Sequence, residues 1–445
     1  MRVKGFRANG VFGYLNFDID FNEDVSFLVG GNGAGKTTAL KLMNALVIPN
    51  FSDLLQIPFE SVFLTLMDNK EEIVISANTL KDDISMSVSG LADPLILPNY
   101  SSTDIDYYSR RRGKHEELME EISRKHVGHP IVRRIAEIQS PIFLGLDRRQ
   151  EDSLKYTGHY YRERDAWIHQ KNIESSHSRR LIKGSIGASL VETEMLVQNS
   201  YRQLREAENE HSSELRDSIL LSAFQYSKFD SEGMLDIVEW REKPVLLQRQ
   251  KEIKEALSNI GVNDTRLGEE VDKYFDEIAK LFDTLKNSTE GITLEFLVNK
   301  AQIERMSKVV EIIDEHKSKV DDLYKPINDF LSTVNNFYSD SNKKLEVDSV
   351  GQLFVRRPNE SQCTIEGLSS GERQLLVIFA HSFFSHYGNT GTVFIIDEPE
   401  LSLHLGWQEK FADTIFSINP DSQYILATHS PEIIGENKDK AVSCR

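Results

Sequence analysis

The sequence Gly30-Gly31-Asn32-Gly33-Ala34-Gly35-Lys36-Thr37-Thr38 matches the phosphate-binding pattern G-x-x-x-x-G-K-[ST]. The apolar residues 25–29 before it predict a strand, and the apolar spacing over 38–46 predicts a helix. Glycines let backbone N–H groups turn toward an anion, and the amino end of the helix adds a partial positive charge. The stretch therefore predicts a site for a nucleoside triphosphate, ATP in the first instance. A simple Gly-rich turn between strand and helix is the disfavoured alternative.

Within this loop the expected roles follow from chemistry. Lys36 is expected to reach the β- and γ-phosphates, and the Thr37 hydroxyl to bind Mg²⁺. The residues expected to bind the nucleotide are Asn32, Gly33, Gly35, Lys36, Thr37 and Thr38.

Length and composition narrow the class of protein. The chain has 445 residues, 39% of them hydrophobic and 27% charged, enough for two to four domains. No stretch approaches the ~18–20 uninterrupted apolar residues of a membrane span, and the strand-like amino terminus has no signal-peptide pattern. The only two cysteines, Cys363 and Cys444, are far apart, so no disulfide framework is expected. These features predict a cytoplasmic protein without a membrane partner.

The distribution of charge bears on nucleic acid. A net charge of −18 argues against a protein that coats nucleic acid along its length. Residues 110–183 nevertheless carry an excess of Lys and Arg, interleaved with aromatic residues such as Tyr160, Tyr161 and Trp167. Such a mixture suits stacking and backbone contacts to nucleic acid. A solvated loop paired with the protein's own acidic residues is the favoured alternative.

The rest of the chain alternates between strand-like and helix-like patterns. Residues 1–90 read as a β-rich lobe, with one strand predicted over 12–21 and others over 61–66, 72–76 and 84–88. Phe12 and Tyr14 are expected in the core, with stacking on adenine as the alternative. Residues 190–345 read as helices, which Pro326 is expected to break or kink. We expect an amino-terminal ATPase half at 1–150, a mostly helical insertion at 151–343, and a carboxy-terminal ATPase half at 344–445.

Three further motifs follow the predicted insertion. Leu368-Ser369-Ser370-Gly371-Glu372-Arg373-Gln374 leads into an apolar helix, whose amino end is a second anion site. The apolar strand 393–396 ends in Asp397-Glu398, where Asp397 can bind Mg²⁺ and Glu398 can act as general base toward water. Residues 424–427 predict another buried strand, followed by Thr428-His429-Ser430-Pro431, in which His429 can contact the γ-phosphate.

In this order and spacing, the motifs resemble those of the ATP-binding-cassette (ABC) ATPase family: phosphate loop, long insertion, signature motif, Walker B strand and switch histidine. Residues 397–404, Asp-Glu-Pro-Glu-Leu-Ser-Leu-His, and residues 428–431 are similar to the RecF/SMC/OLD-nuclease branch. That branch includes ATPase subunits of two-component anti-phage systems such as PARIS and Septu. One departure is that Leu405-Gly406 stand before Trp407-Gln408 where the branch has a proline.

The resemblance implies a fold and a mechanism. It implies an α/β fold, an ABC-type P-loop ATPase head with a β-rich lobe and an inserted helical, hairpin-like domain. Two heads would pair head to tail, with each ATP between Lys36 and Thr37 of one chain and Ser369 and Gly371 of the other. Glu398 would drive hydrolysis and His429 would sense the γ-phosphate, while Asn32 and His404 would report between the two sites. Either Gln139 or Gln150 would complete the Mg²⁺ shell.

The function implied is an ATPase that holds or releases a separate effector in anti-phage defence, as a dimer or a larger ring. Arg445 lies 16 residues after His429, so we expect the TOPRIM nuclease domain of OLD nucleases to be absent. The effector would then be a separate protein, a TOPRIM- or HNH-type nuclease. The main alternative is a DNA-repair or chromosome-maintenance ATPase that binds DNA directly; the motor of a membrane transporter ranks last.

Overall fold

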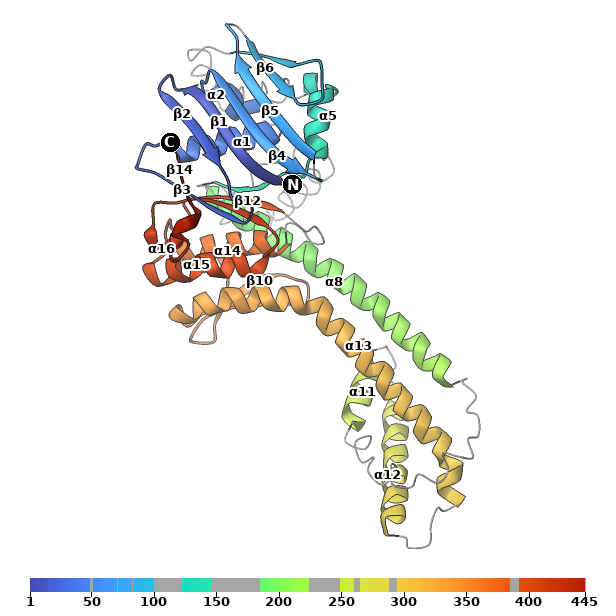
Figure 1. Cartoon of the computed structure of the whole chain (residues 1–445). Helices are drawn as coiled ribbons and strands as arrows, with labels where there is room; N and C mark the ends of the chain where they lie inside the picture. The colour runs from blue at the N-terminus through green and yellow to red at the C-terminus, as the bar shows by residue number, and fades with distance from the viewer. Residues whose placement is uncertain are drawn as a thin grey trace, which may run out of the picture. The chain divides into compact units, whose positions relative to one another are not determined.

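The computed structural model describes residues 1–48, 51–69, 71–81, 83–99, 122, 124–145, 185–223, 249–259, 265–287, 294–384 and 392–444 (Figure 1). The chain forms two compact units, Met1–Asn199 with Phe330–Arg445, which we call the head, and Ser200–Asp329, which we call the helical insertion. These limits fall inside two long helices, α8 (Ser185–Ala223) and α13 (Leu294–Tyr338), whereas the sequence predicts boundaries at 150 and 343.

A five-stranded parallel sheet forms the centre of the head. Its strands, in spatial order, are β14 (Ala441–Ser443), β3 (Val25–Val29), β13 (Gln423–Ala427), β12 (Val393–Asp397) and β8 (Ile142–Leu144). All five residues of β12 and of β13 are buried, as expected for parallel strands covered on both faces. Because the strands are parallel, their carboxyl ends meet at one edge, where the predicted motifs follow β3, β12 and β13.

A six-stranded antiparallel sheet makes up the β-rich lobe. Its strands, in the order β2-β1-β4-β5-β6-β7, are β2 (Leu15–Asp20), β1 (Arg2–Val11), β4 (Ser61–Asp68), β5 (Glu71–Thr79), β6 (Asp83–Val88) and β7 (Leu95–Pro98). The single strand predicted over 12–21 is partly wrong, because residues 12–14 form the turn between β1 and β2. Phe12 and Tyr14 are 47% and 71% exposed, so neither is a core residue.

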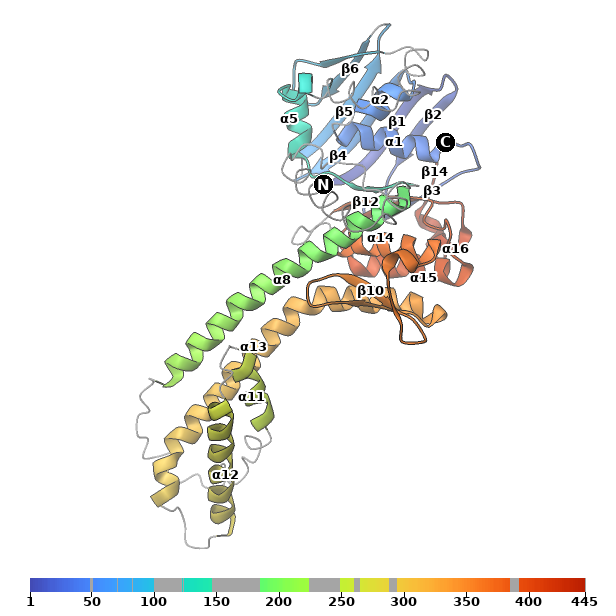
Figure 2. The ribbon, with the colours of Figure 1, turned by 180° about the vertical axis from the view of Figure 1, so that it is seen from behind.

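Helices cover both faces of the parallel sheet. Helix α1 (Lys36–Val47) packs against β4 and β5 on one side and β12 on the other, with α2 (Phe51–Gln56) beside it (Figure 2). On the opposite face lie α14 (Ser370–Phe384) and α15 (Leu405–Ile418), joined by ring contacts such as Phe379 on Phe411 at 6.1 Å. The remaining head elements are α5 (Pro130–Glu137), η2 (Ser339–Ser341), β9 (Lys344–Val347), β10 (Leu353–Arg356), β11 (Gln362–Thr364), η3 (Ile365–Gly367), α16 (Pro431–Ile434) and η4 (Lys438–Lys440).

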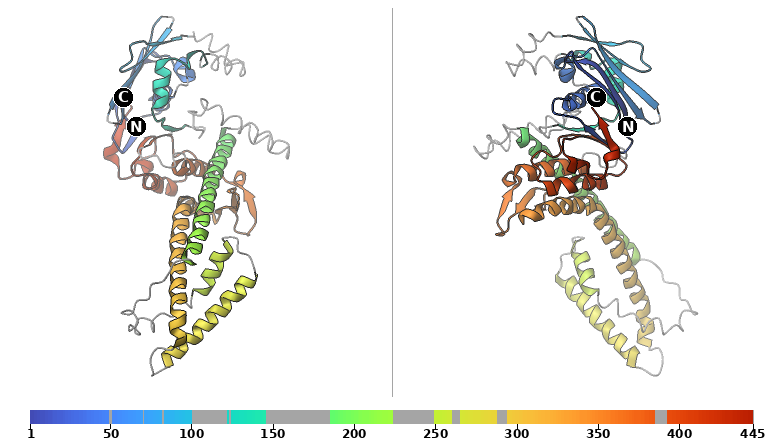
Figure 3. Two further views of the ribbon diagram at one scale, coloured as in Figure 1. Left: turned by 90° about the vertical axis from the view of Figure 1, so that its right-hand side faces the viewer. Right: turned by 60° about the vertical axis from the view of Figure 1, so that its left-hand side comes forward.

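The helical insertion is built from parts of α8 and α13 together with α11 (Gln250–Asn259) and α12 (Thr265–Asn287) (Figure 3). Its buried core consists of Leu215, Ile253, Phe275, Ile278, Leu281, Ile303, Val310 and Ile313. Pro326 lies inside α13 and does not end it, so the predicted break is absent. Among the described residues, no helix combines the length and apolar character that crossing a membrane requires.

The two large sheets are fastened together by a buried side-chain amide. Gln423, the first residue of β13, is 1% exposed. Its Oε1 accepts from the Val3 N–H at 2.7 Å, and its Nε2 donates to the carbonyls of Val3 at 2.8 Å and Asn22 at 2.7 Å. The side chain therefore pairs with β1 as a strand would, and it satisfies three backbone groups.

Replacing Gln423 with Ala should lower the free energy of unfolding by about 2–4 kcal/mol, because buried backbone groups lose their partners. Urea denaturation followed by circular dichroism measures this loss. Gln362, an exposed glutamine in β11, provides the matched control as Gln362→Ala. Equal stability of the two variants would contradict the role given to Gln423.

Candidate functional site

The phosphate loop connects β3 to α1 at the carboxyl edge of the parallel sheet. Gly33 and Gly35 adopt positive φ angles of 78° and 90°. A Cβ on Gly35 would also lie 2.7 Å from Cζ of Phe17, so only glycine fits there. No side chain caps α1 and its first turn has no acidic residue, which leaves its amino end open to an anion.

The Lys36 side chain extends back to the first residue of the phosphate loop. Its Nζ donates to the carbonyl of Gly30 at 3.0 Å and contacts both ring nitrogens of His429, Nδ1 at 3.3 Å. Burial lowers the pKa of the Lys36 ammonium, and the nearby carboxylates of Glu398 and Asp397 act in the opposite direction. The structure thus brings the predicted lysine and the predicted switch histidine together.

Two oxygen ligands suited to Mg²⁺ lie side by side. The Thr37 hydroxyl donates to Oδ2 of Asp397 at 2.8 Å, and Asp397 is fully buried at the end of β12. No group of three or more His, Cys, Asp or Glu side chains that could hold a metal occurs among the described residues. A hydroxyl and a carboxylate fit Mg²⁺ in a nucleotide site, where substrate phosphates and waters supply the other ligands.

Glu398 stands where the chain leaves β12. Its N–H donates to the carbonyl of Ala427 at 2.8 Å, which extends the pairing with β13 by one residue. Its φ of 45° is in the left-handed region, an unfavourable conformation for a residue with a side chain. This turn places the predicted general base between Asp397 and the loop of residues 399–404.

Helix α14 begins with the predicted signature motif. The Ser369 N–H donates to Glu372 Oε2 at 2.7 Å and the Glu372 N–H donates to Ser369 Oγ at 3.3 Å, which is a capping box. Ser369 and Ser370 are exposed, whereas Gly371 is buried. A Cβ on Gly371 would lie 2.4 Å from the carbonyl oxygen of Ser402. Gly371 is therefore needed for packing within its own chain.

The sequence motifs described above assign no role to Glu372, although the Ser369-x-x-Glu372 spacing is the signal of a capping box. Its carboxylate binds Lys343 Nζ at 2.8 and 2.9 Å and accepts from the Ser341 hydroxyl at 2.8 Å. Burial acts to raise its pKa, but these hydrogen bonds outweigh burial, so the pKa of Glu372 lies below its usual range. The start of α14 is thereby fastened to the turn that follows α13.

One predicted metal ligand is wrong. Gln139 lies before β8 and donates from Nε2 to the Thr392 hydroxyl at 3.1 Å, while Thr392 precedes β12. Both residues are at the amino edge of the parallel sheet, opposite Asp397, so Gln139 cannot complete the Mg²⁺ shell. The other candidate, Gln150, lies outside the described residues, as does much of the basic region 110–183.

At Leu405-Gly406, where the sequence departs from the branch pattern, helix α15 begins regularly. His404 precedes α15, and its carbonyl accepts from the N–H groups of Trp407 and Gln408. The His404 ring lies 4.4 Å from the Trp407 ring, whose Nε1 donates to Asp340 Oδ2 at 2.8 Å. Asn32 is exposed on the phosphate loop.

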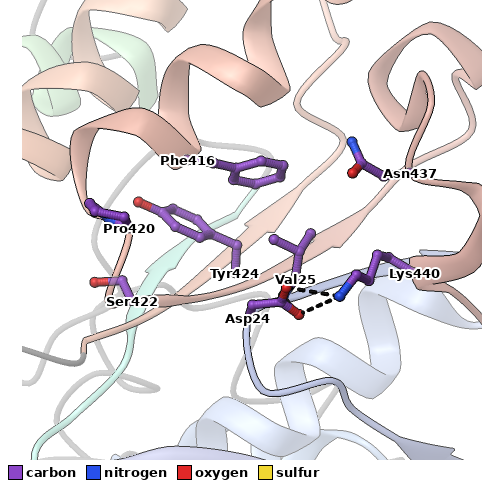
Figure 4. A pocket seen from close by; sticks show the side chains of 8 residues that line it. All are labelled: Asp24, Val25, Phe416, Pro420, Ser422, Tyr424, Asn437 and Lys440. Atoms are coloured by element: carbon purple, nitrogen blue, oxygen red, sulfur yellow. Dashed lines mark hydrogen bonds and ion pairs between the residues drawn. The ribbon is translucent and has the colours of Figure 1, made fainter.

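A pocket of about 230 Å³ lies elsewhere in the head (Figure 4). Its lining includes Val25 and Tyr424 from the starts of β3 and β13, with the ion pair of Lys440 and Asp24 at 2.8 Å. This is the amino edge of the sheet, opposite the phosphate loop, so the pocket is separate from the site described above.

Substituting Gly371 with Ala should lower the free energy of unfolding by about 1–3 kcal/mol, because the new methyl group collides with the Ser402 carbonyl. It should also slow ATP hydrolysis, since that carbonyl belongs to the loop that follows Glu398. Denaturation and phosphate-release assays test both effects. Gly128→Ala is the control, because a Cβ there meets nothing within 4 Å. Wild-type behaviour of Gly371→Ala would refute this packing role.

Comparison with known proteins gives a family match and several distant relatives. The AAA ATPase domain family (AAA_15) matches residues 1–434. The Retron Vc95 probable ATPase of Vibrio cholerae serotype O1 biovar El Tor is 24% identical over 204 residues, which are 41% of this chain. The aligned part is 34% of that relative, so the chain spans about a third of its length.

Solved structures that are similar to this chain include two SMC head domains. One is the Smc head domain of Pyrococcus furiosus, with an extended coiled coil, bound to the C-terminal domain of ScpA. It has a TM-score of 0.41 and a sequence identity of 12%, and the match covers 100% of this chain and 94% of that chain. The SMC head domain from Thermotoga maritima has a TM-score of 0.36 and 11% identity, covering 99% and 92%. The predicted ABC-type class is confirmed by the family match over nearly the whole chain and by the assembled motifs: the chain belongs to the AAA ATPase domain family (AAA_15) and is an ATPase.

Proposed function

We propose that two heads of this ATPase pair head to tail around Mg-ATP and that the nucleotide state holds or releases a separate effector. One observation carries the pairing. Ser369 and Ser370 are exposed, and among the described residues no hydrogen bond or ion pair joins Ser369 to the phosphate loop of its own chain. The signature motif is therefore available to the nucleotide of a second copy.

Within one head, each group has a role in hydrolysis. Lys36 offers its ammonium to the phosphates, and backbone and side-chain groups of Asn32, Gly33, Gly35 and Thr38 surround them. Thr37 and Asp397 hold Mg²⁺, which neutralises phosphate charge when bound. Glu398 accepts a proton from the attacking water, and His429 beside Lys36 contacts the terminal phosphate. In the paired state, Ser369 and Gly371 of the second copy complete the site.

The effector and the biological setting rest on the relatives. The aligned relative is named a retron ATPase, which favours a role in defence. The RecF/SMC/OLD resemblance adds the expectation of a separate nuclease partner, of the TOPRIM or HNH type. In this proposal ATP binding assembles the form that holds the effector, and hydrolysis or a trigger releases it.

Direct DNA binding is the alternative, and the six-stranded sheet offers it little support. The basic side chains on the six-stranded sheet are paired with acids: Arg2 with Glu23 at 3.3 Å, Lys4 with Glu72 at 3.1 Å and Arg7 with Asp18 at 2.8 Å. These pairs do not form the basic surface that phosphate binding requires. The experiment below includes DNA for this reason.

Glu398→Gln should accumulate in the ATP-bound assembly, because the water loses its general base while the nucleotide ligands remain. Light scattering with Mg-ATP should show a dimer or a larger ring for this variant, and a monomer without nucleotide. The protein encoded next to this chain and a DNA duplex are added in parallel. A monomer that binds only the duplex would replace the proposed function with the DNA-binding alternative.

Mixing two inactive variants tests whether sites form between chains. Lys36→Ala removes the phosphate ligand and Ser369→Arg blocks the signature motif, so each variant alone should be inactive. In a mixed pair, one site combines an intact phosphate loop with an intact signature motif. Phosphate release should then recover to about one quarter of the wild-type rate, since about half of the pairs are mixed and each has one intact site. Absence of recovery would show that each chain completes its own site.

A further inference from the structure

The carboxylate of Glu400 accepts two hydrogen bonds from the segment that follows β13. Its Oε1 accepts from the backbone N–H of His429 at 2.6 Å, and its Oε2 accepts from the Thr428 hydroxyl at 2.9 Å. Thr428 Oγ1 accepts in turn from the Ser430 N–H at 3.0 Å. Glu400 forms no ion pair with a Lys or Arg among the residues that the structure describes. Both carboxylate oxygens of Glu400 therefore accept hydrogen bonds from residues 428 and 429.

The surroundings show what these bonds fix. Thr428 is 1% exposed and Ser430 is 8% exposed, whereas His429 between them is exposed. The backbone on both sides of the histidine is thus anchored, and the imidazole is free to face Lys36, which it contacts. Because the Glu400 carboxylate accepts from the backbone N–H of His429, it fixes the position from which the imidazole side chain extends.

Glu400 also lies in the loop that meets the signature helix. The carbonyl of Pro399 accepts from Gln374 Nε2 at 2.9 Å, and the carbonyl of Ser402 lies against Gly371. The Glu400 carbonyl accepts from the Leu403 N–H at 2.9 Å, which closes the loop on itself. The start of α14 therefore contacts the loop on both sides of Glu400, through the Gln374 side chain at Pro399 and through Gly371 at Ser402.

We infer that Glu400 is a positioning residue that holds the His429 imidazole beside Lys36, where the terminal phosphate of ATP binds. It acts through His429 and does not touch the reacting atoms. Through the loop 399–403 it also makes the position of His429 depend on the signature helix. This inference rests on the proposed function, because it assigns the phosphate contact to His429.

The test compares Glu400→Ala with Glu400→Gln and with Glu409→Ala, the removal of an exposed carboxylate on α15. Glu400→Ala should lower kcat about 10- to 100-fold, as loss of groups that orient a catalytic side chain does. Its affinity for ATP relative to ADP should fall about fivefold, since only ATP presents the terminal phosphate. Glu400→Gln keeps the acceptor for the His429 N–H and should stay within about threefold of wild type.

Further variants separate this inference from the proposed function. His429→Ala should show the same losses, and Glu400→Ala should add nothing in that background, because the two residues act as one unit. Thr428→Val, which keeps the side-chain volume, should show a smaller loss and covers the case in which Glu400→Ala does not fold.

If His429→Ala loses activity and Glu400→Ala does not, the positioning role is wrong and the proposed function stands. If His429→Ala matches wild type, the proposed phosphate contact fails first. Equal losses of ATP and ADP affinity in Glu400→Ala would indicate a merely structural role and overturn the inference.

Discussion

The site depends on the parallel alignment of β3, β13 and β12. These strands begin at residues 25, 423 and 393, far apart in the sequence. They pair in register, with Asp397 opposite Ala427 and Ala427 opposite Leu28. That register places the end of each strand at one edge, so the phosphate loop, Asp397 and His429 meet although nearly 400 residues separate the first from the last. Short, fully buried strands can form such a sheet only because helices cover both faces. The chemistry is thus a consequence of strand direction.

Much of this could be read from the sequence, for a physical reason. Strands such as 393–397 are runs of apolar residues that must be buried on both faces, and a fixed spacing of glycine, lysine and threonine needs no tertiary information. The interior of α13 was also predictable, since its apolar positions recur at helical spacing. The outer sheet was less so, because the turn at residues 12–14 interrupts an apolar alternation that continues through it.

What the sequence could not supply is the identity of side-chain partners. The resemblance implies a glutamine in the Mg²⁺ shell, for which Gln139 is one candidate. The end of the strand on which a residue lies decides this role, and Gln139 lies at the amino end of β8, away from Asp397. Glu400 stood inside a quoted motif without a function, because its bonds to residues 428 and 429 exist only after β12 and β13 pair. The same holds for Glu372 and Lys343, which pair although 29 residues separate them in the sequence.

The order of strands in the two sheets has a consequence for synthesis on the ribosome. The six-stranded sheet uses residues 2–98 and pairs mostly neighbouring strands, so it can form early. In the parallel sheet β3 waits for β13 and β14, which emerge about 20–80 s later at ordinary elongation rates. Until then β3 has no partner strand on either side, and the apolar face of α1 that later meets β12 is uncovered. A nascent chain of this ATPase therefore presents an incomplete nucleotide site and an open hydrophobic layer for most of its translation.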